Sequence, residues 1–196
     1  MHLASRPIVS SLVTLMLVAA AARGLAAGPA PLAAMDPLAS AIQAAQKRLR
    51  DALSQEFPAA DIELRQEDGT FDTVVAVAVY PKAYPGTGVA RVAIDRKTGV
   101  AYGVRGERSL ADFARERHWL QTPPETTQLV RFANTLLFDG VAIFDDAPIR
   151  PSVKAKDGRL VIETVQRWMP SNSGEVLTIT IPASGPETIA RGPLPK

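Results

Sequence analysis

The sequence contains no cysteine among its 196 residues. This absence excludes disulfide bonds, thiol nucleophiles, cysteine metal ligands and a lipid-modified cysteine. Histidine is nearly absent too, because the chain holds only His2 and His118. After position 27 a lone histidine remains, which excludes histidine-rich zinc sites and a histidine pair for acid–base catalysis. We therefore predict a protein that is not an enzyme and has no cofactor.

An excess of one charge is also missing. Lys and Arg number 22 against 20 Asp and Glu, and Arg6 and Arg23 both lie in the first 27 residues, where no acidic residue occurs. The rest of the chain is therefore balanced in charge, whereas a protein that binds nucleic acid normally has a basic excess. We expect no nucleic-acid partner. The hydrophobic fraction of 46% and the charged fraction of 21% are typical of a globular protein.

Residues 1–27 have the pattern of a cleavable secretory signal peptide. Arg6 precedes an apolar, uncharged segment at 8–22, and small residues follow it. This segment is shorter than the roughly 20 residues that span a bilayer. We expect cleavage near residue 27 and a periplasmic or secreted location, with an uncleaved N-terminal anchor as the alternative. Residues 28–35 are predicted to be a flexible lead, and we expect no membrane span in the mature chain.

A first α+β unit is predicted over residues 36–107. Asp36 and Pro37 are typical of a helix start, apolar residues follow at three- and four-residue spacing to about Glu56, and Pro58 ends the helix. Glycine at Asp68-Gly69 predicts a hairpin turn, because glycine accepts positive φ. The expected strands lie at 61–67, 71–80, 89–95 and 100–105, with a further turn at 96–99.

Residues 108–121 are predicted to form a connecting helix and loop, and residues 122–196 a second α+β unit. Ser109 caps the connecting helix, with Asp112 in the capping-box position. Thr122 is expected to cap the next helix, with a proline in its first turn and Glu125 as the reciprocal glutamate. The expected strands lie at 151–156, 159–168, 175–181 and 187–191, with a helix end at 139–140 and a hairpin turn at 157–158.

Strands that follow each helix in runs predict an α+β fold, an antiparallel sheet with helices packed on one face. Both units have the same order of elements, which favours two tandem α-β-β-β-β units. The correspondence is one of element order, and a chance order common to α+β chains is the alternative.

A hairpin pattern in the first unit resembles known families. Residues 92–101 (VAIDRKTGVA) resemble the V-x-V-D-x-x-T-G-x-V hairpin that closes PepSY domains, and the hairpin of small bacterial immunity-protein domains. The tandem helix-plus-four-strand plan is similar to the β-lactamase inhibitory protein family, whose disulfides are absent here. These resemblances imply a sheet that binds a protein partner, and they carry over no binding residue.

Four side chains are candidates for binding a partner. Tyr80, Tyr84, Trp168 and Met169 lie at the ends of the two longest predicted strands and in the loops that follow them. Aromatic and methionine side chains bury much area at little entropic cost, which suits protein recognition. The alternative is that they close the core at the ends of the sheets.

Other polar groups have simpler interpretations. Ser171 and Ser173 lie in a polar loop without a G-x-S-x-G motif, and His118 at a helix end is predicted to cap or pack. Asp145 and Asp146 are adjacent, so in a strand they point to opposite faces, and they lack the spacing of a calcium loop.

We also expect Glu163 to share a sheet face with Val161 and Val165. The loop at 81–88 has two glycines but lacks the lysine and following helix of a phosphate-binding loop.

The leading hypothesis is an exported binding protein that restrains or neutralises a protein partner, as an inhibitor or an immunity protein does. One alternative is a PepSY-like accessory protein that assists assembly in the cell envelope. Another is a hydrolase that uses carboxylates alone, which needs two acids about 5–10 Å apart in a cleft.

Overall fold

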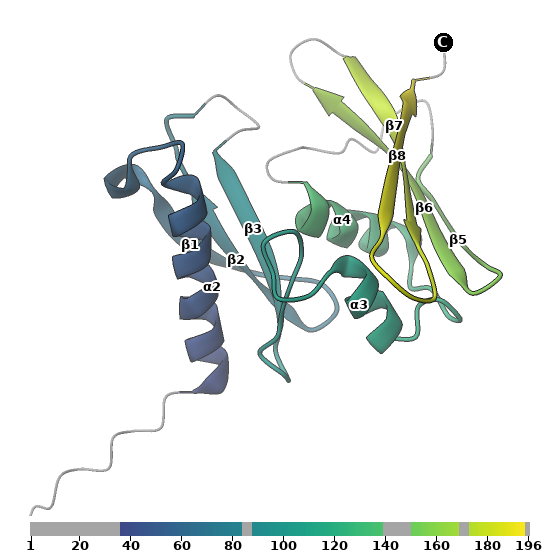
Figure 1. Ribbon diagram of the computed structural model, residues 1–196, viewed down its shortest axis with the longest axis horizontal. Coiled ribbons are helices and arrows are strands. Elements are labelled where there is room, and N and C mark those ends of the chain that lie inside the picture. The colour runs from purple at the N-terminus through teal and green to yellow at the C-terminus, as the bar shows by residue number, and fades with distance from the viewer. Residues whose placement is uncertain (1–35, 84–87, 139–149, 169–172, 195–196) are drawn as a thin grey trace, which may run out of the picture. The chain divides into compact units, whose positions relative to one another are not determined.

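The computed structural model describes residues 36–83, 88–138, 150–168 and 173–194. These residues belong to one compact unit that begins at Asp36. They form helices α2, α3 and α4, a single 3-10 turn (η2, Ala59–Asp61) and two four-stranded antiparallel sheets (Figure 1). The predicted α+β class is confirmed, and the two sheets fit the predicted tandem units. Within the described residues, no helix has the length and apolar character needed to cross a membrane.

Helix α2 (Pro37–Leu53) starts as its sequence predicts. The Asp36 carboxylate accepts a hydrogen bond from the Leu38 amide at 3.0 Å, and proline occupies the first helical position. The apolar stripe of the helix packs on the first sheet. The helix ends three residues before the predicted Glu56 and continues as turns that lead to Pro58.

The first sheet has the strand order β1-β2-β3-β4. Its strands are β1 (Glu63–Asp68), β2 (Thr73–Val79), β3 (Val89–Asp95) and β4 (Ala101–Tyr102). Alternate residues of β2 and β3 face α2 and form one core with it: Ala45, Leu49, Leu53, Ile62, Ala76, Ala78, Ala90, Val92, Ile94 and Ala101. Small side chains in the strands let the helix lie close to the sheet.

The turn between β1 and β2 differs from the predicted Asp68-Gly69 turn. Four residues connect the strands, and the positive φ angles belong to Phe71 (56°) and Asp72 (59°) rather than to Gly69. This backbone places the Phe71 ring 4.7 Å from the Trp119 ring and 5.3 Å from the Phe132 ring. Burial of an aromatic ring offsets the strain of two left-handed residues.

The last predicted strand of this unit, 100–105, shortens to Ala101–Tyr102. Gly103, with φ of 126°, turns the chain away from the sheet. The amides of Glu107 and Arg108 then both donate to the Ala101 carbonyl, at 2.8 and 3.1 Å. The chain therefore closes a compact loop where strand pairing was expected.

Helix α3 (Leu110–Glu116) has the predicted capping box, in which Ser109 and Asp112 bond each other's amides. Helix α4 (Thr126–Leu137) does not use Thr122 as its cap. The Glu125 carboxylate takes that role, accepting from the Thr127 and Gln128 amides at 2.8 Å each. The predicted helix end at 139–140 lies outside the described residues.

The second sheet has the order β5-β6-β7-β8. Its strands are β5 (Ser152–Lys156), β6 (Arg159–Trp168), β7 (Ser173–Ile181) and β8 (Thr188–Pro193). Strand β6 has the bounds that the sequence predicted. The turn before it is the predicted two-residue hairpin turn, with positive φ at both Asp157 (52°) and Gly158 (69°).

A second, larger core joins α3 and α4 to the inner face of the second sheet, where Leu160, Ile162, Leu177 and Ile179 are fully buried. Ala93 and Tyr102 of the first sheet also belong to this core. The connecting segment is therefore a structural part of the domain rather than a linker.

Candidate functional site

The four residues predicted to bind a partner are only partly described. Tyr80 is half-buried, and its ring stacks on Phe57 with the ring centres 4.5 Å apart and the planes 17° apart. This contact favours the alternative in which Tyr80 closes the core at the end of β2. Trp168 is the last residue of β6, opposite Ser173. Tyr84 and Met169 lie outside the described residues.

The other polar candidates belong to different elements or lie outside the described residues. His118 is exposed and has φ of 57°, one residue beyond the C-cap of α3, Arg117. Glu163 is half-buried in β6 and accepts a hydrogen bond from the Ser152 hydroxyl at 3.2 Å. Ser173 begins β7. The pair at 145–146 and Ser171 are not described, and within the described part of the chain no three acidic or histidine side chains form a metal-binding group.

The D-x-x-T-G hairpin stabilises the fold through the Asp95 side chain. Asp95 is buried, and its Oδ1 accepts from the amides of Lys97 (2.9 Å) and Thr98 (2.8 Å) and from the Thr98 hydroxyl (3.1 Å). Its Oδ2 accepts from the Arg117 guanidinium, beyond the end of α3. Burial alone raises the pKa of Asp95, but these bonds together hold its pKa below the ordinary value. The motif therefore anchors α3 to the first sheet.

The feature that the sequence did not reveal is the free edge of β1. Among the described strands, β1 pairs on one side only, with β2. Five of its six residues are exposed, and Leu64 is half-buried. An edge strand of this kind offers unpaired backbone amides and carbonyls to a second extended chain.

The other three edges are less suited to such pairing. Strand β4 has two residues, both buried, and β8 ends in Gly192 and Pro193. Strand β5 carries two exposed charges of one sign, Lys154 and Lys156, a pattern that repels further strands. Strand β1 carries both signs, so it can accept a partner of complementary charge.

A groove runs beside this edge on the face that α2 covers. A cavity of about 330 Å³ lies between α2 and β1. Its lining combines three apolar side chains with four polar ones, namely Asp36, Leu38, Ala39, Ile42, Gln43, Gln46 and Gln66. The Gln46 side chain donates to the Arg65 carbonyl at 3.1 Å, which ties the helix to the edge strand.

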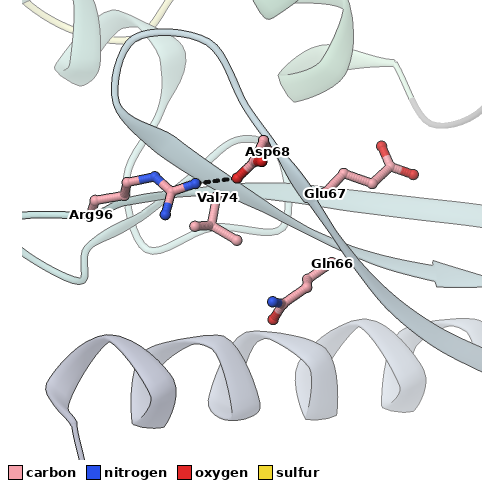
Figure 2. Close-up of a pocket in the computed structure, with 5 residues that line it drawn as sticks. All are labelled: Gln66, Glu67, Asp68, Val74 and Arg96. Atoms are coloured by element: carbon pink, nitrogen blue, oxygen red, sulfur yellow. Dashed lines mark hydrogen bonds and ion pairs between the residues drawn. The ribbon is translucent and has the colours of Figure 1, made fainter.

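A second cavity, of about 150 Å³, follows along the same strand and shares Gln66 with the first. Figure 2 shows Gln66 pointing toward α2, Glu67 pointing away from it, and Arg96 reaching Asp68. This ion pair, together with a hydrogen bond of 3.0 Å from the Arg96 amide to the Asp72 carbonyl, joins the β1–β2 turn to the β3–β4 turn. These contacts connect the end of β1 to the neighbouring turn.

Comparison of the chain with protein-family models, with curated proteins and with solved structures gives no match. The functional argument therefore depends on the residues and geometry described above.

Proposed function

We propose that this chain is an exported, non-enzymatic binding protein that restrains or neutralises a protein partner, as inhibitors and immunity proteins do. The export part of the proposal is supported by the charged and apolar pattern of residues 1–27. The binding part is supported by one observation, the exposed edge of β1 with a groove beside it.

In this proposal the partner contributes an extended segment that pairs with β1. Backbone hydrogen bonds along the strand supply affinity, and side chains of alternate residues supply specificity. On the α2 side the segment meets Gln66 and the groove, where Leu38 and Ile42 offer apolar contact. On the opposite side it meets the charges of Arg65 and Glu67.

The proposal is tested by capture from periplasmic extract with matched tryptophan variants. Gln43 is exposed and lines the groove, whereas the next residue, Ala44, is also exposed and does not line it. Gln43→Trp fills the groove, while Ala44→Trp adds the same ring elsewhere on the same helix. We expect the wild type and Ala44→Trp to retain one stoichiometric protein and Gln43→Trp to lose it.

Two results would contradict the proposal. One is the absence of any stoichiometric partner with the wild-type protein. The other is equal capture by both tryptophan variants, since it places the contact away from the groove. Stoichiometric addition should also lower the activity of a captured enzyme or toxin, whereas unchanged activity favours an accessory protein of the cell envelope.

A further inference from the structure

We propose that two copies of this chain pair with each other through their β1 edges and that this pairing covers the edge until the partner arrives. The inference rests on the proposed function for its biological role, because the two copies and the partner compete for one surface. The physical argument for pairing depends only on the symmetry and charge of β1.

Symmetry restricts how two such edges can meet. An antiparallel pair of identical strands has its two-fold axis perpendicular to the sheet, so both copies of α2 lie on the same face. One residue must then lie opposite its own copy, and residues at equal distances on either side of it pair with each other. Only a few registers satisfy this condition.

Charge selects among those registers. With Gln66 at the centre, Arg65 of each copy lies opposite Glu67 of the other, which gives two symmetric attractive pairs. With Arg65 at the centre, arginine meets arginine and Glu63 meets Glu67. With Glu67 at the centre, two glutamates meet, and a centre at Leu64 overlaps less of the strand. The Gln66 register therefore combines long overlap with complementary charge.

The Arg65 side chain is available to pair with Glu67 of the second copy. The Arg65 side chain is 55% exposed, and its present ion pair is with Glu63 of its own strand, which is 51% exposed. An ion pair this exposed is weak, so the Arg65 guanidinium can turn to a carboxylate on the second copy.

The α2 face supports the same register. The two grooves lie side by side across the seam, and Gln66, which lines both cavities, lies opposite its copy at the centre. The amide of glutamine is both donor and acceptor, so two copies can hydrogen-bond reciprocally. Leu38 and Ile42 line the groove on each side of the seam.

Sedimentation velocity and light scattering at low salt test this pairing without any partner. We expect the wild type to form a dimer whose fraction rises with concentration and falls with added salt. Arg65→Glu and Glu67→Arg should each weaken dimerisation about tenfold or more, because each turns two attractive pairs into repulsive ones. The double variant Arg65→Glu/Glu67→Arg should restore the dimer. Lys154→Glu, on the edge of the other sheet, should leave it unchanged.

Unfolding curves for each variant show whether a loss of dimer follows from a loss of fold. Glu67→Gln is a milder variant, because it removes the attraction between the copies without adding repulsion. A wild type that stays monomeric at every concentration overturns the inference, as does a double variant no better than the single ones. If the monomeric protein still captures its partner, the proposed function survives and the dimer alone is refuted. A dimer without a captured partner refutes the proposed function instead.

Discussion

Substitution of Asp95 gives a quantitative prediction from the buried hairpin network. Asp95→Ala removes the acceptor for two amides, one hydroxyl and the Arg117 guanidinium. Lys97 and Thr98 are exposed and the Arg117 side chain is 36% exposed, so water can replace part of what is lost. Each neutral hydrogen bond contributes about 1 kcal/mol and the charged one somewhat more. Because water replaces part of this, we expect the free energy of unfolding to fall by about 3 kcal/mol. Asp95→Asn keeps the Oδ1 acceptor but loses the charge, and should cost about 2 kcal/mol.

Urea unfolding followed by the fluorescence of Trp119, which lies in the larger core, measures both losses. The pH dependence adds a second check. The pKa of Asp95 is lower in the folded protein than its ordinary value of 3.8, so its stabilising effect is complete above that value. It is lost as the pH falls through the lowered pKa, and the curves for wild type and Asp95→Asn should then converge. Losses below about 0.5 kcal/mol for both variants, or a constant difference across this pH range, would refute the reasoning.

Two further predictions concern the backbone conformation at His118 and the space beside Gly106. His118 has φ of 57° at the position after a helix end where glycine is usual, so His118→Gly should raise the free energy of unfolding by about 0.5–1 kcal/mol, and His118→Ala should not match it. An equal gain from alanine would show that backbone strain is not the cause. A Cβ at Gly106 would lie 2.7 Å from the Ala101 carbonyl oxygen, so Gly106→Ala should cost about 2 kcal/mol or more in urea unfolding. Gly192→Ala, where nothing lies within 4 Å, should stay within about 0.5 kcal/mol, and similar losses at both glycines would contradict the packing argument.

Local signals predicted much of the fold. The caps at Asp36 and Ser109 depend on residues within one helical turn, and the Asp157-Gly158 turn depends on the backbone freedom of two adjacent residues. Such interactions are complete within a short segment, so the sequence of that segment is enough to predict them.

One prediction that differed depends on contacts between distant segments, and another depends on a choice between two nearby residues. Phe71 takes a left-handed conformation because Trp119 and Phe132, far along the chain, surround its ring. Thr122 was predicted as the cap from its spacing to Glu125 and the proline between them, but the Glu125 carboxylate itself accepts from two amides.

The candidate edge was not predictable for a related reason. The alternating charges of β1 lie in a predicted strand, but only the strand order identifies that strand as an edge. Strand order comes from pairing across the sheet, which a pattern within one strand does not encode. A strand with both signs of charge and few apolar residues was the one signal available in the sequence.

Hydrogen–deuterium exchange with and without the captured partner tests the central claim most directly. The protein is used at a concentration low enough to keep it monomeric, so that β1 is uncovered at the start. We predict that the partner slows exchange at residues 63–68 and leaves residues 152–156 of another edge strand, β5, unchanged. Unchanged exchange in β1, with protection elsewhere on the molecule, would contradict the claim that β1 is the binding edge.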